Sequence, residues 1–135
     1  MKFFATLAIL LLPVGLFAQQ TDPNDPEMQK KFRESLDKEV EHLTNVLELD
    51  DAQIFWADSI LTHDFTAMRD ELAELNKAKV SNPDLFYMAQ DKWHEQMYNA
   101  FRAILDDEQW TKYLKTGAGK EKKARDKREA KRNKQ

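Results

Sequence analysis

LELDDAQI at residues 47–54 and AILDDEQW at residues 103–110 contain the same pattern, Leu-Asp-Asp-x-Gln, in copies that begin 56 positions apart. The first aspartate of each copy, Asp50 or Asp106, suits an N-cap, because its side chain can accept a hydrogen bond from a free amide of the first helical turn. The glutamine three positions later can return a bond to the N-cap amide and so complete a capping box. The repeat therefore predicts that two helices begin at these points.

The leucine before each of these aspartates extends the motif. A leucine at this position packs against the large apolar residue five positions later, Ile54 or Trp110, as a hydrophobic staple that sets the angle between successive helices. The repeat therefore also predicts how one helix follows the next. The residues of the two motif copies are Leu49, Asp50, Gln53, Leu105, Asp106 and Gln109.

Apolar residues recur every three or four positions on both sides of the repeat, as they do along one face of a helix. This spacing predicts helices over residues 26–48, 51–79, 83–104 and 107–115. The 135 residues include only 3 glycines and 4 prolines, which is too few turn formers for a β-sandwich or barrel. The expected fold is all-α, with four helices and a long antiparallel hairpin.

The chain divides into four segments by composition. Residues 1–18 have a positive start, an apolar run and a final alanine, which is typical of a secretory signal and too short to cross a bilayer. Residues 19–25 form a polar leader interrupted by proline, and residues 26–116 are the helical domain. Residues 117–135 are a basic tail. The signal and the absence of cysteine predict an exported protein of the periplasm, where nucleic acid is not an expected partner.

Charge is distributed unevenly along the chain. Residues 19–119 carry a net charge of −10 and residues 120–135 carry +6, with a glycine-containing hinge at 117–119 between them. The tail has no apolar residue larger than alanine, so it is not expected to insert into a membrane. Opposite charges stand four positions apart at Glu121/Arg125, Lys122/Asp126 and Arg125/Glu129, which favours a nascent helix, but we predict that the tail is mostly disordered. Its functional alternative is a weak attraction to anionic envelope surfaces or to acidic partners.

Several classes of chemistry are excluded or disfavoured by the composition. The chain has no cysteine, which excludes disulfides and thiol nucleophiles, and it has no glycine-rich phosphate loop. His42, His63 and His94 do not stand four positions apart in any pair, so no two imidazoles share a helical face as metal ligands, and solvated histidines are expected. The paired aspartates are assigned to helix caps. We therefore expect no catalytic residue, no metal site, no cofactor and no enzymatic activity.

The two motif copies resemble those of the LTxxQ-motif family of periplasmic proteins, the Spy/CpxP-like group. The resemblance covers residues 46–114, and both copies have aspartate where the family usually has threonine. Aspartate caps a helix as well as threonine does. The resemblance implies a cradle of four helices that dimerises and holds partly unfolded proteins without ATP. Some relatives instead restrain an envelope-stress sensor, and some bind zinc.

A holding protein of this kind needs exposed apolar side chains near charged ones. Six residues fall beside or away from the core face of their helices and are candidates for a client surface or a dimer interface: Trp56, Ile60, Ala67, Tyr87, Met88 and Tyr98. The family's best-known chaperones have a basic concave face, whereas this body is acidic, so client specificity is not transferred. The expected function is ATP-independent binding of unfolded or stress-exposed envelope proteins. The alternative is a regulatory adaptor that binds the periplasmic part of a sensor or anti-sigma protein.

Overall fold

The computed structural model describes residue 22 and residues 24–135, so the expected signal segment lies outside the described residues. Within this part the chain is helical and contains no strand, which confirms the all-α expectation. The elements are α2 (Pro26–Leu47), α3 (Asp51–Lys77), α4 (Pro83–Ile104), α5 (Asp107–Tyr113), the π-helical turn η1 (Leu114–Ala118) and α6 (Gly119–Asn133).

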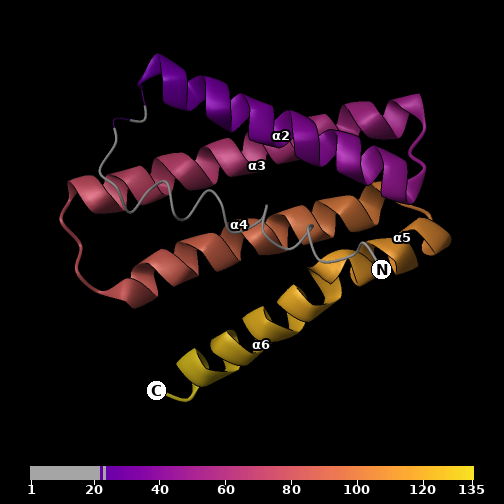
Figure 1. Ribbon diagram of the computed structural model, residues 1–135. Helices are drawn as coiled ribbons and strands as arrows, with labels where there is room; N and C mark the ends of the chain where they lie inside the picture. The colour runs from indigo at the N-terminus through magenta and orange to yellow at the C-terminus, as the bar shows by residue number, and fades with distance from the viewer. Residues whose placement is uncertain (1–21, 23) are drawn as a thin grey trace, which may run out of the picture.

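The helices run up and down beside one another (Figure 1). α3 and α4 form the long antiparallel hairpin, α2 packs back along α3, and α6 returns from α5 along α4. The hairpin turn ends at Asn82, whose side chain caps α4, followed by Pro83 at the first helical position. Proline suits this position because its missing N–H has no helical partner there. α3, with 27 residues, is about 40 Å long.

One apolar core lies between α2, α3 and α4 and is closed at one end by the two motif leucines. The buried apolar residues are Leu36, Leu43, Leu47, Leu49, Ala57, Leu61, Phe65, Met68, Leu72, Ala89, Met97, Phe101 and Leu105. Most of them come from the periodic apolar faces of the sequence. Burial of each large apolar side chain stabilises the fold by about 1.5–3 kcal/mol. The helical spacing therefore decides both the elements and the faces by which they pack.

The structure corrects the prediction of a disordered tail, because residues 119–133 form helix α6. The local sequence contributes an i, i+4 pair between Lys122 and Asp126, at 2.9 Å. The larger contribution is tertiary, since basic side chains of α6 pair with Asp91 and Glu95 of α4. These carboxylates lie far from the tail in sequence, so the charge spacing indicated a nascent helix but not the partners that hold it.

The expected hinge is a sharp change of direction between α5 and α6 (Figure 1). Gly117 has φ 109° there, a backbone conformation that favours glycine because a Cβ would be strained. A Cβ on Gly119 would lie 3.1 Å from the carbonyl oxygen of Leu114. The two glycines therefore allow α6 to fold back along α4.

Candidate functional site

Both Leu-Asp-Asp-x-Gln strings form capping boxes. Asp50 Oδ1 accepts a hydrogen bond from the Gln53 amide at 2.8 Å, and the Asp50 amide donates to Gln53 Oε1 at 3.0 Å. The second box has the same two bonds between Asp106 and Gln109, at 2.8 and 3.1 Å. Each box satisfies two amides that would otherwise lack partners at the start of a helix.

The two glutamine side chains also meet each other, which the sequence reasoning missed. Gln53 Nε2 donates to Gln109 Oε1 at 2.7 Å, and Gln109 Nε2 donates to Gln53 Oε1 at 3.0 Å. The second N–H of each side-chain amide donates to a backbone carbonyl at the end of another helix. Gln53 Nε2 donates to the Ile104 carbonyl at 3.0 Å, and Gln109 Nε2 donates to the Leu47 carbonyl at 3.2 Å. Each amide thus makes all four of its hydrogen bonds, and this glutamine pair ties the ends of α2 and α4 to the starts of α3 and α5.

The motif leucines lie directly beside this polar pair. Leu49 and Leu105 are 8% and 6% exposed and belong to the apolar core. Ile54 and Trp110, the expected staple partners, are partly buried against the same core. The repeat therefore supplies buried leucines next in sequence to a fully bonded, partly buried polar pair, and partial burial strengthens each hydrogen bond relative to water.

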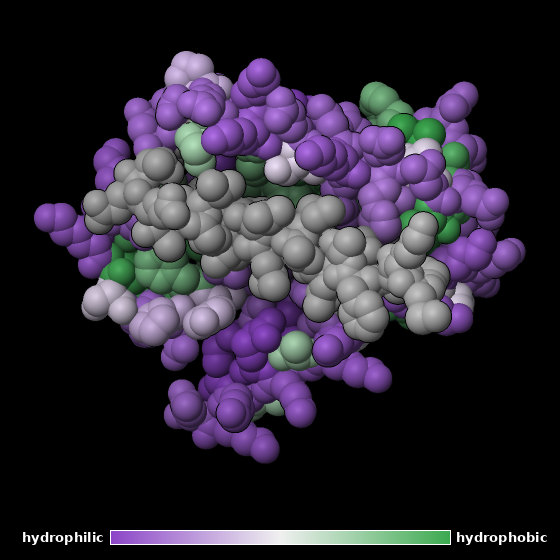
Figure 2. Space-filling model, viewed as in Figure 1, coloured by the Kyte–Doolittle hydropathy of each residue, from purple (hydrophilic) through white to green (hydrophobic). Residues whose placement is uncertain are grey.

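Apolar side chains are exposed where α2 ends and α3 begins. Val46, Phe55 and Trp56 are 38%, 63% and 53% exposed, and we call these three residues the apolar corner. The rings of Phe55 and Trp56 pack edge to face, with centroids 5.3 Å apart. Figure 2 shows hydrophobic side chains gathered at this end of the molecule. Trp56 was a predicted surface residue, whereas Phe55 was missed although it follows the same helix start.

The other predicted surface residues lie in different surroundings. Tyr87 and Met88 are 53% and 46% exposed at the start of α4, beside the exposed Leu85. Tyr98 is partly covered, because its ring packs against Trp110 at 4.9 Å and lies under two cationic side chains of α6. The remaining two, Ile60 and Ala67, are partly buried on α3.

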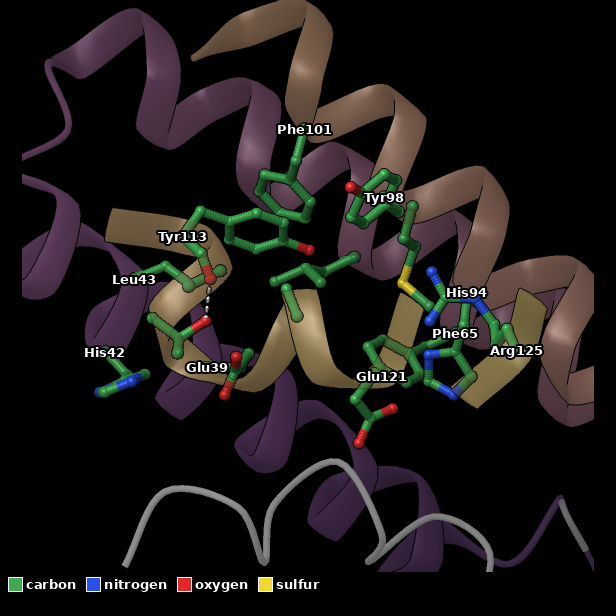
Figure 3. Close-up of a pocket in the computed structure, with 14 residues that line it drawn as sticks. Glu39, His42, Leu43, Phe65, His94, Tyr98, Phe101, Tyr113, Glu121 and Arg125 are labelled. Carbon is green, nitrogen blue, oxygen red and sulfur yellow. Dashed lines mark hydrogen bonds between the residues drawn. The ribbon is translucent and has the colours of Figure 1, made fainter. Parts of the chain in front are cut away.

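A small cavity of about 50 Å³ lies among α2, α3, α4 and α6 (Figure 3). Burial, and then the charge of Arg125, lower the pKa of His94 to about 4, while burial raises the pKa values of the Glu39 carboxyl and the Tyr113 hydroxyl. His42 Nε2 and Arg125 Nη2 are buried without a hydrogen-bond partner in the described structure. In Figure 3 these two side chains lie at opposite sides of the cavity, so they do not converge on one point. The volume suits a few water molecules.

Two of the three histidines differ from the expectation of solvated side chains, since His94 is largely buried and Nε2 of His42 is buried, whereas His63 is exposed. His94 is largely buried and its ring packs edge to face on Phe65 at 5.9 Å. Nδ1 of His63 lies 2.7 Å from Oδ1 of the buried Asp64. Among the residues that the structure describes, no group of three histidine, aspartate or glutamate side chains could hold a metal ion.

Comparisons with protein-family models, curated proteins and solved structures found no match to this chain. Within residues 24–135, no helix has the length and apolar character needed to span a membrane.

Proposed function

We propose that this protein is an ATP-independent, chaperone-like protein of the periplasm that binds partly unfolded envelope proteins at the apolar corner. The single observation that carries the proposal is the exposure of the packed Phe55–Trp56 pair, at 63% and 53%. Single exposed apolar residues are common, whereas two aromatic rings packed against each other at the surface form a contact surface. The periplasmic location depends on the signal-like residues 1–18.

The size of the corner fits weak, reversible binding. Aromatic side chains bury roughly 200 Å² each when fully covered, so the exposed parts of Phe55 and Trp56, at 63% and 53%, offer about 230 Å² together. At about 25 cal/mol per Å² this gives roughly 6 kcal/mol, which is comparable with the cost of association. A client is therefore held only while several such contacts form, and it is released without nucleotide. The proposal involves no catalysis and no cofactor.

Acidic side chains surround the corner. Glu48, Asp50 and Asp51 are exposed between Val46 and Phe55 in sequence. Negative charge beside an apolar patch attracts basic unfolded segments and keeps the patch soluble. We therefore expect positively charged clients to be held better than acidic ones, the reverse of a chaperone with a basic face.

The proposal is tested by aggregation of reduced lysozyme, a basic client, followed by light scattering without ATP. The reductant does not alter this protein, because it has no cysteine. We expect near-stoichiometric protein to slow aggregation and the Phe55→Ser/Trp56→Ser variant to lose most of this effect. The comparison variant is Tyr87→Ser/Met88→Ser, which removes two exposed apolar side chains of the other candidate surface. If it keeps the effect that Phe55→Ser/Trp56→Ser loses, client binding is assigned to the apolar corner. Unchanged aggregation at a several-fold excess of the parent protein would refute the holding function.

A regulatory adaptor is the competing hypothesis. It predicts no effect on aggregation and one saturable partner, such as the periplasmic part of a sensor or anti-sigma protein. Capture from an envelope extract separates the two, because a holding protein retains many weakly bound proteins and an adaptor retains one stoichiometric band.

We also propose that the protein forms a homodimer, on the basis of the long α3 and its exposed Trp56. Light scattering at tens of micromolar should return twice the monomer mass of 15.9 kDa. The Trp56→Glu variant then separates two uses of this side chain. Loss of the dimer identifies Trp56 as an interface residue, and loss of client binding by an intact dimer identifies it as part of the client surface.

A further inference from the structure

The basic residues of α6 divide by type and by direction. Four of them pair with carboxylates of α4: Lys122, Arg125, Arg128 and Arg132. The other five are exposed lysines that form no ion pair with any described residue, and the last of them is the C-cap of the helix: Lys120, Lys123, Lys127, Lys131 and Lys134. We call the four residues that pair with α4 the inner set and the five exposed lysines the outer set. All three arginines of the helix belong to the inner set, and the outer set contains only lysine. We call the outer set the lysine row.

The inner set fixes α6 against α4. Arg128 donates to both carboxylate oxygens of Asp91 at 2.9 and 2.7 Å, and Arg132 donates to Asp91 at 3.2 Å. Arg125 is only 7% exposed and donates to Glu95 at 3.2 Å. Burial alone would raise the pKa of Asp91, but the hydrogen bonds and charges of Arg128 and Arg132 outweigh it, so the pKa of this carboxyl is lowered. Paired arginines of this kind hold a definite orientation, because the guanidinium is planar and binds a carboxylate in a fixed geometry.

The lysine row is consequently held in an ordered array. Its spacings of three, four, four and three residues place the five side chains within a sector of about 80° at 3.6 residues per turn. The row is about 21 Å long at 1.5 Å per residue. The acidic residues of α6, Glu121, Asp126 and Glu129, fall outside this sector, and Asp126 is paired with Lys122. The row is thus a line of positive charge without an intervening acid.

We propose that the lysine row is a docking surface for anionic phospholipid bilayers. Lysine presents a mobile point charge, which suits a diffuse layer of headgroups, whereas a site for one phosphate or carboxylate is usually built from arginine. The row is straight and has no neighbour larger than alanine on its own face, so it can lie on a plane without inserting. Each lysine near an anionic bilayer raises the binding constant by about fivefold. This factor is smaller at high ionic strength, because salt screens the charges.

The charge of the rest of the molecule orients the docked protein. Residues 19–119 carry −10, so the body is repelled by the surface that attracts α6. α6 forms one flank of the molecule and α2 the opposite flank (Figure 1). Figure 2 shows hydrophilic side chains over the protruding α6 segment. Docking through the lysine row therefore directs the acidic helices away from the bilayer.

The test is sedimentation with vesicles of phosphatidylcholine alone or mixed equally with phosphatidylglycerol. The protein used begins at Gln19, so that it lacks the apolar signal-like segment and keeps every described residue. We expect binding to the anionic vesicles in 20 mM salt, release in 500 mM salt, and no binding to phosphatidylcholine. The Lys123→Gln/Lys127→Gln/Lys131→Gln variant should bind on the order of 100-fold more weakly, since it loses three of the five charges.

The matched control is Lys30→Gln/Lys31→Gln/Lys38→Gln, which makes the same change of net charge on exposed lysines of α2. It should bind within about twofold of the parent, and circular dichroism should show equal helix content in all three proteins. Equal weakening of both variants would overturn the proposal, because net charge and not the row would then govern binding. Binding to duplex DNA but not to anionic vesicles would overturn it in favour of a nucleic-acid surface. No unfolded client is present, so the result is independent of the holding function.

Discussion

Replacement of Gln109 by methionine should destabilise the fold by roughly 4 kcal/mol. Methionine is close to glutamine in size, so the main change is the loss of the side-chain amide. That amide makes four hydrogen bonds, two with Gln53, one to the Leu47 carbonyl and one from the Asp106 amide. Each contributes about 1 kcal/mol net. Gln53→Met removes the four corresponding hydrogen bonds of the Gln53 amide and should lower the free energy of unfolding by a similar amount.

The double variant distinguishes a real pair from two independent caps. The two bonds that join the amides are lost in either single variant, so they are counted twice when the single effects are added. The double variant loses six bonds and should cost about 6 kcal/mol, which is about 2 kcal/mol less than the sum. Two separate capping boxes would instead give additive effects.

The assay is urea unfolding followed by tryptophan fluorescence, since Trp110 is partly buried in the core beside the second box. A stabilising osmolyte such as trimethylamine N-oxide keeps the double variant folded and is present for all four proteins. Gln29→Met, on an exposed position of α2, is the control and should change stability by less than about 0.5 kcal/mol. Additivity within about 0.5 kcal/mol would falsify the crosswise pairing of Gln53 and Gln109.

Three further predictions concern stability. The free energy of unfolding should fall by about 2 kcal/mol between pH 7.5 and 5.0, because the unfolded His94 takes up a proton near its usual pKa of 6.5, whereas the folded side chain, buried beside Arg125, has a pKa of about 4. Urea titrations of parent and His94→Gln protein test this, and an equal loss in both would assign the effect to other groups. Gly117→Ala should cost roughly 1–3 kcal/mol, measured by thermal melting, because φ is 109°; an unchanged melting temperature contradicts the strained turn. Phe101→Ala should lower the free energy of unfolding by about 3–5 kcal/mol, since this side chain is 1% exposed. Phe55→Ala at the surface should lower it by under about 0.5 kcal/mol. Similar losses of stability in the two variants, measured by urea unfolding, would contradict the assigned core.

The helices and their core faces could be predicted because both depend on local pattern. Residues 51–79 were expected to be helical and α3 covers Asp51–Lys77, with Leu61, Phe65 and Met68 buried as the spacing required. The starts of α3 and α5 followed from the capping strings, whose hydrogen bonds join residues only three positions apart. Interactions of this range are contained in a short stretch of sequence.

The interactions that were missed join residues that are distant in sequence. The glutamine pair spans 56 positions, and Arg128 reaches Asp91 across 37. The burial of His94 likewise depends on neighbouring helices. Two signals were nevertheless present in the sequence. The repeat indicated that two equivalent amides existed, and the separation of arginines from lysines on opposite faces of residues 119–133 indicated that one face had fixed partners.

The glutamine pair bears on the proposed function because it adjoins the apolar corner. Val46 precedes Leu47, whose carbonyl accepts a bond from Gln109, and Phe55 lies two residues after Gln53. The backbone on both sides of the corner is therefore held by the same side-chain pair. A surface that is already ordered loses less conformational entropy on binding, so more of its small apolar area contributes to affinity. Loss of the pair should therefore weaken client binding even at temperatures where the variant remains folded, although neither glutamine belongs to the contact surface.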